Sequence, residues 1–229
     1  RQRQMCIRDR VNIMAIGDHL RDVMDLYGSP SCPHTNACLL VAGEKGVDLN
    51  CHAETDWGPS GSVRGMSPLG IGPILKDRSA TNYGVIACLS YLDDKGFGPS
   101  LVHRNGVTRA RMFQEMGVAA QCNVSDDASL AAALDVLDTT LGTDLGNMKG
   151  DYVCGQYTLA DAMWAGVCQC ATNAGKGNAI SSRSRVNTWF SAVQSHPSTS
   201  KEAINPFSCM ATKADHDAGT MREIRVNAG

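Results

Sequence analysis

The sequence predicts a small α/β domain followed by an all-α domain. Two observations support this order. Up to about residue 97 the periodic segments alternate between strand-like and helix-like, and beyond it every periodic segment has helical spacing. With 229 residues, 43% of them hydrophobic, the chain can bury a sizeable core. We therefore expect an N-terminal extension at 1–22, an α/β domain at 23–97 and a helical domain at 98–229.

Strands and helices of the first domain are indicated by short runs between turn residues. Three short segments flanked by Gly, Pro, Asp or Ser predict strands, at 23–29, 46–52 and 72–77. Pro33 suits the first position of a helix, and apolar residues continue at helical spacing to Gly43 or Gly46. The segment "TNYGVIACLSYLDDKG" at 81–96 predicts a second helix that ends at Gly96.

The second domain is predicted to be helical throughout its periodic part. Four segments have apolar residues at helical spacing: 105–121, 126–142, 157–175 and 184–197. Thr158 and Asp161 have the spacing of a capping box at the start of the third segment, so we expect them to be structural. Substituting such a cap costs about 0.5–2 kcal/mol of stability.

Composition and charge exclude several classes of function. A formal net charge of −2, with Lys and Arg scattered along the chain, argues against nucleic acid or a membrane surface as a partner. No apolar run approaches the roughly 20 residues that a spanning helix needs. Ten cysteines without regular spacing favour reduced thiols, and Cys168 and Cys170 point to different sides of a helix. We expect these two to be core residues and expect no metal site.

The first ten residues match neither helical nor strand periodicity. Within them, "RQMCIRD" resembles the translated end of a sequencing adapter, so we treat 1–10 as an artefact, the alternative being a basic tail. We expect a cytoplasmic location, or an organellar one with a targeting peptide missing from this sequence.

Several segments resemble the cytosolic glutathione transferases in order and spacing. "LYGSPSCPHTNACLLVAGEKGV" (26–47) is similar to their first strand, active-site turn and first helix, with the Cys-Pro pair placed as in omega-type members. "SPLGIGPILKD" (67–77) resembles the segment that contains a cis-proline. "GQYTLADA" (155–162) and "WFSAVQSHP" (189–197) resemble the capping segment and a late helix. The resemblance covers about 23–200 and implies a thioredoxin-like N-terminal domain before the all-α domain.

The resemblance implies that Cys32 is the catalytic residue. A cysteine at a helix amino terminus faces unpaired N–H groups and the positive end of the dipole, which favour the thiolate. Such a thiolate could accept glutathione as a mixed disulfide, which a second thiol would release. Thr35 stands where a dithiol motif would have its second cysteine, so the chemistry is monothiol. Ser31 is the second choice, because serine-type members use a hydroxyl to hold the glutathione thiolate. We expect His34 to be a solvated side chain of the first helical turn, the alternative being that it helps to hold a nearby thiolate.

The expected glutathione site is only partly present. The resemblance implies a cis peptide bond at Pro73, with the backbone of Gly72 pairing with the cysteinyl part of glutathione. The family's Glu-Ser pair at the next helix start is missing, because Asn82-Tyr83 or Gly84-Val85 stand there instead. Three further residues could dock the glutathione carboxylate at this helix terminus or could merely cap it: Ser79, Thr81 and Asn82.

Two functions from different classes follow. The first is an enzyme that uses glutathione as cosubstrate for group transfer or for thiol/disulfide reduction of the dehydroascorbate type, with Cys32 as the thiolate. The second is a non-catalytic subunit of the same fold with a structural or interaction role. Glutathione is the expected small-molecule partner, and a homodimer or a larger protein assembly is the expected oligomeric context.

Overall fold

The computed structural model describes residues 23–54, 56–143 and 150–196. Four strands form one mixed sheet in the order β2-β1-β3-β4. Their bounds are β1 (Met24–Gly28), β2 (Leu49–Ala53), β3 (Ile74–Lys76) and β4 (Thr81–Tyr83). The β1 and β2 strands are parallel, whereas β3 is antiparallel to both β1 and β4. A parallel pair needs a long crossover, and the helix between β1 and β2 supplies it.

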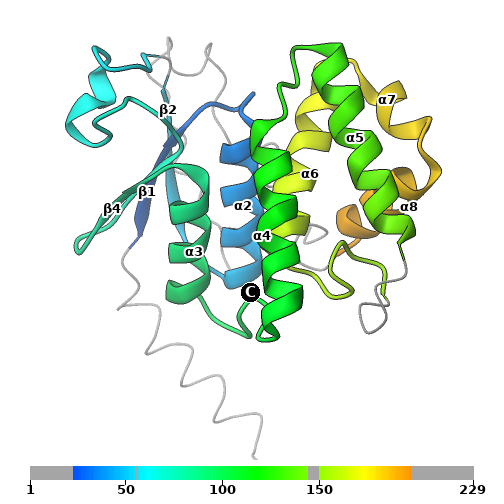
Figure 1. Cartoon of the computed structure of the whole chain (residues 1–229). Coiled ribbons are helices and arrows are strands. Elements are labelled where there is room, and N and C mark those ends of the chain that lie inside the picture. Colours follow the sequence, from blue (N-terminus) through cyan, green and yellow to red (C-terminus); the bar gives the residue numbers. More distant parts are fainter. Residues whose placement is uncertain (1–22, 55, 144–149, 197–229) are drawn as a thin grey trace, which may run out of the picture.

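Helices α2 (Pro33–Lys45) and α3 (Val85–Lys95) pack beside each other against the sheet (Figure 1). Leu26 and Leu75 point from neighbouring strands into the core beneath them and are fully buried. Between β2 and β3, a loop with one 3-10 turn, η1 (Ser62–Gly65), extends away from these helices (Figure 1). This α/β arrangement puts the amino ends of α2 and α3 near the loop that precedes β3.

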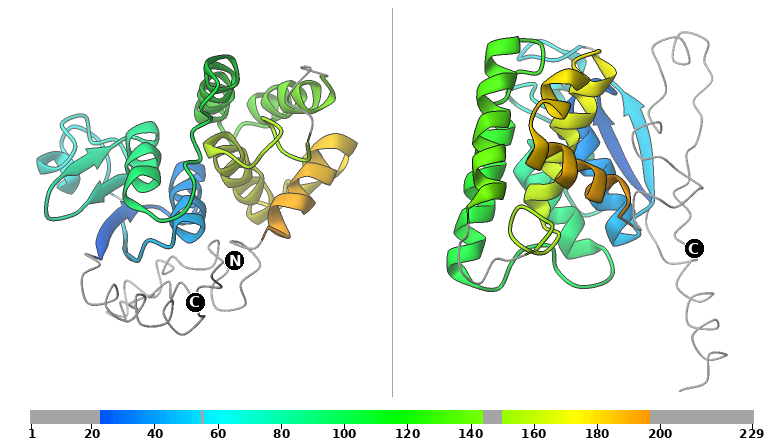
Figure 2. Two further views of the ribbon diagram at one scale, coloured as in Figure 1. Left: turned by 90° about the horizontal axis from the view of Figure 1, so that it is seen from below. Right: turned by 90° about the vertical axis from the view of Figure 1, so that its right-hand side faces the viewer.

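The remaining helices form an all-helical half that lies beside α2 (Figure 2). They are α4 (Gly106–Gln121), α5 (Asp127–Gly142), α6 (Leu159–Asn173), α7 (Gly177–Ser181) and α8 (Ser184–Gln194). Twelve of the fifteen residues of α6 are buried, so α6 is the central helix and not an amphipathic surface helix. It packs directly against α2, which joins the two halves.

Local capping explains where several helices begin. The side chains of Asn105 and Asp126 accept hydrogen bonds from the first-turn amides of α4 and α5. At α6, Thr158 and Asp161 form the predicted capping box, with Asp161 Oδ2 accepting the Thr158 N–H at 2.9 Å. Asp161 is fully buried and also accepts a hydrogen bond from Trp189 Nε1 at 2.9 Å. Both residues are therefore structural, as predicted.

One element prediction was wrong. The segment 81–96 was predicted to be a single helix, but Thr81–Tyr83 form β4 and the helix begins only at Val85. The reason is a hairpin: Lys76 pairs with Thr81 and Ile74 with Tyr83, around a turn that the Asp77 carboxylate holds. In addition, β2 begins three residues later than predicted, and the short helix α7 was not predicted.

Two expected absences concern the described part of the chain only. No helix within it is long and apolar enough to cross a membrane. No cluster of three or more His, Cys, Asp or Glu residues within it could hold a metal ion. The last part of the predicted helical domain, from residue 197 onward, lies outside the described residues. The predicted N-terminal extension at 1–22 also lies outside them.

Candidate functional site

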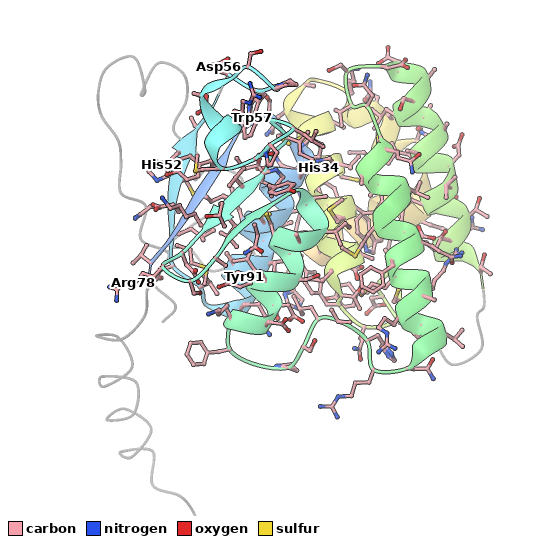
Figure 3. All side chains as sticks on the ribbon, turned by 60° about the vertical axis from the view of Figure 1, so that its left-hand side comes forward. His34, His52, Asp56, Trp57, Arg78 and Tyr91 are labelled. Carbon is pink, nitrogen blue, oxygen red and sulfur yellow. The ribbon has the colours of Figure 1, made fainter. Side chains whose placement is uncertain are left out.

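A cleft of about 720 Å³ opens at the amino ends of α2 and α3. Its volume falls within the range of about 300–1,000 Å³ that is typical of small-molecule sites. Figure 3 labels two residues of its wall, His34 from α2 and Trp57 from the loop after β2. The lining residues are Ser29, Ser31, Cys32, His34, Thr35, Trp57, Gly70, Ile71, Gly72, Pro73, Gly84 and Val85.

Cys32 is the N-cap residue of α2 and lines the cleft. Its backbone is extended (φ −90°, ψ 121°), and its carbonyl accepts the first helical hydrogen bond from Asn36 N at 3.1 Å. Its own N–H donates to Ser29 O at 3.0 Å, and its side chain does not cap the helix. The thiol is therefore at the positive end of a 13-residue helix, with access to the cleft, as the sequence predicted.

The turn before Cys32 is held by two buried polar side chains of α2. Thr35 Oγ1 accepts a hydrogen bond from Ser29 N at 3.3 Å. Asn36 Nδ2 donates to Pro30 O at 3.1 Å and to Cys170 Sγ, in α6, at 3.0 Å. Because Thr35 and Asn36 are almost fully buried, the turn is fixed to the helix that follows it and to the central helix.

Gly166 of α6 brings the central helix into backbone contact with the amino end of α2. A Cβ atom placed on Gly166 would lie 2.3 Å from Pro33 O and 3.2 Å from Ala37 N. Only glycine permits this approach, because the atoms it faces are backbone atoms that cannot rotate away. Gly166 therefore supports the start of α2 at the candidate site, and it was not among the residues predicted from the sequence.

The other described thiols differ from Cys32 in their surroundings. Burial raises the pKa of Cys170 to about 11, partly opposed by the hydrogen bond from Asn36, and raises the pKa of Cys154 to about 12. Burial also raises the pKa of Cys168, a core residue as predicted. A hydrogen bond with Cys88, together with burial, raises the pKa of Cys38 well above its usual value. Within the described residues, Cys32 is the cysteine that lines the cleft.

Ser31 and His34 flank Cys32 and also line the cleft. Ser31 is exposed, and its hydroxyl lies 3.0 Å from that of Ser29. His34 is half-buried rather than solvated, and its Nε2 atom is enclosed without a hydrogen-bond partner. Burial lowers the pKa of His34, although a hydrogen bond with the Ala120 backbone opposes this shift. His34 is therefore a neutral imidazole at neutral pH and supplies no positive charge to a thiolate beside it.

Gly72 and Pro73 also line the cleft, and they are joined by the predicted cis peptide bond. The indole of Trp57 covers Gly72 so closely that a Cβ atom there would lie 2.4 Å from Trp57 Cη2. Trp57 Nε1 donates to Glu54 O at 2.9 Å, which holds the ring in place. The indole of Trp57 therefore occupies the space that a side chain at position 72 would need. Trp57 was not among the site residues predicted from the sequence.

Ser79, Thr81 and Asn82, three of the predicted glutathione-binding residues, do not line the cleft. Ser79 lies in the β3-β4 turn, where its hydroxyl donates to Asp77 Oδ1 at 2.8 Å. Thr81 and Asn82 lie in β4 and pair with residues of β3. They are not at the start of α3 because the strand separates them from the helix.

Gly84 and Val85 lie at the start of α3 instead, and both line the cleft. Gly84 is the N-cap residue and has a φ of +80°, a conformation that favours glycine. No side chain caps this helix, so its first amides remain for a ligand or water. Of the two pairs that the resemblance left open, Gly84-Val85 is the one at the start of α3, and neither residue carries a carboxylate or hydroxyl.

The fold is that of the glutathione transferases. The sequence matches no protein-family model and no curated protein. Among solved structures, a delta-class glutathione transferase of Nilaparvata lugens is 22% identical and covers 88% of this chain and 98% of its own, with a TM-score of 0.65. A glutathione S-transferase of Rhodospirillum rubrum is 18% identical, with coverages of 83% and 94% and a TM-score of 0.67. Glutathione S-transferase III in apo form is 22% identical, with coverages of 77% and 93% and a TM-score of 0.63.

Proposed function

We propose that this chain is a glutathione transferase homologue that carries out glutathione-dependent thiol transfer, with Cys32 as the nucleophile. The observation that carries the proposal is the position of Cys32, at the amino end of α2, in a cleft that Gly72 and Pro73 also line. Thr35, three residues after Cys32, has its hydroxyl engaged with Ser29 N, so the reaction uses one thiol. We also propose that the α/β domain ends near residue 97 and that the protein works in a reducing compartment, in the cytoplasm or an organelle.

The reaction has two exchange steps that balance. In the first, the Cys32 thiolate attacks the glutathionyl sulfur of a mixed disulfide between glutathione and a second thiol. The S–S bond of the substrate breaks, a Cys32–glutathione disulfide forms, and the released thiolate takes a proton from water. In the second, the thiolate of free glutathione attacks the glutathionyl sulfur on Cys32. Oxidised glutathione leaves, and the Cys32 thiolate is restored.

Chain residues assist these steps by position and not by acid–base catalysis. The positive end of α2 stabilises the Cys32 thiolate both as attacking group and as leaving group. Backbone groups of Gly72 would pair with the cysteinyl part of glutathione, and the uncapped N–H groups at the start of α3 would donate hydrogen bonds to its γ-glutamyl carboxylate. Dehydroascorbate is a second oxidant of this class, reduced with two electrons from two glutathione molecules that leave as the disulfide.

The test is disulfide exchange by the purified chain with glutathione and a glutathionylated peptide. We expect Cys32→Ser to lower the initial rate at least about 100-fold, since a serine hydroxyl cannot form the mixed disulfide. Cys122→Ser is the matched control. The Cys122 thiol is half-exposed, burial raises its pKa, and Cys122 does not line the cleft. Mass spectrometry of the wild type after treatment with oxidised glutathione should find one glutathionyl group, on Cys32. Full activity of Cys32→Ser would exclude the proposal.

Ser31 is the alternative to Cys32 as the residue that acts on the glutathione sulfur. If Ser31→Ala abolished activity while Cys32→Ser retained it, the serine hydroxyl would hold the glutathione thiolate and the enzyme would be a serine-type transferase. We expect the reverse, a loss of no more than about threefold for Ser31→Ala, because its hydroxyl contributes one exposed hydrogen bond.

A second candidate function is a non-catalytic subunit of a homodimer or a larger assembly. It is favoured by Gly84 and Val85, which leave the amino end of α3 without the acid and hydroxyl of the family's pattern. For such a subunit, millimolar glutathione would not bind, and light scattering at micromolar concentration would show an oligomer whose assembly is unaffected by Cys32→Ser. Glutathione binding and turnover by the wild type would exclude it.

A further inference from the structure

Cys170 of α6 is connected through one side chain to the turn that carries Cys32. The amide nitrogen of Asn36, in α2, donates to Cys170 Sγ at 3.0 Å and to Pro30 O at 3.1 Å. Pro30 is the second residue of the β-turn that Cys32 closes, because Cys32 N donates to Ser29 O at 3.0 Å. The amide of Asn36 therefore joins the turn before Cys32 to the central helix of the other half.

Both N–H groups of the Asn36 amide are used in this way. Pro30 O can only accept a hydrogen bond, so the nitrogen of the amide must face the turn. Asn36 is 1% exposed and Cys170 is 5% exposed, so both side chains are shielded from water. Because a buried donor without an acceptor is unfavourable, removing the Cys170 acceptor would also weaken the hold of Asn36 on Pro30 O.

The backbone of α6 approaches the same end of α2. Gly166 lies one helical turn before Cys170, and it faces Pro33 O so closely that a Cβ atom would lie 2.3 Å from it. Two successive turns of α6 therefore contact the first turn of α2, one through Gly166 and the next through Cys170. The place of Cys32 depends on how the two halves of the molecule pack.

The first turn of α2 matters because the cleft offers little other stabilisation to a thiolate. Among the described residues that line the cleft there is no Asp, Glu, Lys or Arg. Burial lowers the pKa of His34, so its imidazole is neutral at neutral pH. Two thiols that interact electrostatically with Cys32 also stay uncharged: a hydrogen bond with Cys88 and burial raise the pKa of Cys38, and burial raises that of Cys170 to about 11. The backbone N–H groups that begin α2 have no side-chain cap and can stabilise the thiolate.

We infer that Asn36 and Cys170 are a positioning pair, through which the helical half of the molecule sets the reactivity of Cys32. Neither residue lines the cleft, so the pair acts through the turn. With Pro30 O anchored, Cys32 stays at the amino end of α2, beside the uncapped N–H groups. The inference rests on the proposed function in taking Cys32 as the reacting thiol, and it gives Cys170 a role beyond that of a core residue.

The test measures the rate of Cys32 alkylation by iodoacetamide in the full chain, followed by peptide mapping. At about pH 7 this rate depends on how well the thiolate is stabilised, whereas at about pH 9.5 an accessible thiol is mostly ionised in any variant. We expect Cys170→Ala to lower the rate about threefold at the lower pH and less than about 1.5-fold at the higher pH. Asn36→Leu removes both hydrogen bonds and should have at least the same effect. Cys170→Ser keeps an acceptor and should retain the wild-type ratio of the two rates.

Cys168→Ala is the matched control. Cys168 is a fully buried cysteine two residues before Cys170, and its side chain points to a different side of α6. Its loss should lower the stability of the protein without changing the ratio of the two alkylation rates.

Three results would overturn the inference: a wild-type ratio in Cys170→Ala, equal slowing of its alkylation at both pH values, or the same change of ratio in Cys168→Ala. If Asn36→Leu does not fold, the Cys170 variants decide. Absence of disulfide exchange by the wild type would instead exclude the proposed function, and the alkylation rates would still decide whether Asn36 and Cys170 position Cys32.

Discussion

Lys45 Nζ lies 3.0 Å from Asp93 Oδ1, and the two side chains are 2% and 1% exposed. This ion pair joins the last turn of α2 to α3. Both side chains also form hydrogen bonds with the segment that follows α3. Lys45 Nζ donates to Pro99 O at 3.0 Å, while Asp93 accepts hydrogen bonds from Leu101 N at 2.8 Å and Ser100 Oγ at 2.6 Å. The buried pair therefore fixes the segment that leads from the α/β half to α4.

Removing the cation from this pair should be strongly destabilising. We expect Lys45→Met to lower the free energy of unfolding by about 3–5 kcal/mol, because it leaves the buried Asp93 carboxylate without its counter-charge. Lys95→Met is the control: Lys95 is 45% exposed and 3.8 Å from Asp77, so its loss should cost less than about 1 kcal/mol. Urea unfolding followed by circular dichroism measures both. Similar losses for the two variants would contradict the role of the buried pair.

The Asp77 turn should make stability depend on pH in the acid range. Burial alone would raise the pKa of Asp77 above its usual 3.8. Its carboxylate accepts hydrogen bonds from the Tyr91 hydroxyl, from the hydroxyl and N–H of Ser79 and from the N–H of Ala80, and together these lower the pKa to about 2. Because the folded pKa is the lower one, the stabilisation is fully present above about pH 4 and is lost as the pH falls toward 2. The difference in unfolding free energy between the wild type and Asp77→Asn should therefore shrink between pH 4 and 2. A constant difference over this range would refute the prediction.

Two glycines in helices should respond oppositely to alanine. At Gly166 the added methyl would meet the Pro33 carbonyl, so Gly166→Ala should cost about 1–3 kcal/mol and should slow thiol exchange at Cys32 by moving the start of α2. At Gly117 in α4 nothing lies within 4 Å of a Cβ atom, so Gly117→Ala should stabilise the protein by about 0.5–1 kcal/mol. Thermal unfolding compares the two variants. Stabilisation by both substitutions would show that the approach of α6 to α2 is not tight.

Alkylation should distinguish Cys32 from the other described thiols. With limiting iodoacetamide at pH 7, we expect Cys32 to be modified first, because it lines the cleft at a helix amino terminus. Cys38 and Cys168 are fully buried and should remain unmodified until the protein unfolds. Peptide mapping by mass spectrometry gives the order, and Cys32→Ser identifies the peptide. Earlier modification of Cys122 or Cys51 would argue against a specially reactive Cys32.

Features that depend on neighbouring residues could be predicted from the sequence. Pro33 sets the start of α2 and so places Cys32 at its amino end, through a backbone preference that needs no other part of the chain. The Thr158–Asp161 capping box lies within one helical turn, and it was predicted correctly. The order of strands and helices, and with it the α/β domain followed by helices, follows from such local signals.

The positions of the residues after Pro73 that were expected to bind glutathione could not be predicted in the same way. Three residues are too few for a strand signal, and β4 forms because β3 lies beside it and because Tyr91 and Ser79 both bond to Asp77. That pairing moves Ser79 and Thr81 away from the start of α3. Sequence periodicity treated the same segment as a continuation of the helix.

The sequence alone determined that a cysteine would begin a helix after the first strand, because caps, prolines and apolar periods act over a few neighbouring residues. Only the tertiary structure decided what surrounds that cysteine. Gly166 meets Pro33, and Trp57 covers Gly72, through contacts between segments that are distant in the chain. Such contacts depend on how whole elements pack, and the packing of α6 against α2 and of the loop against the cis-proline gives the cleft its shape and its uncharged wall.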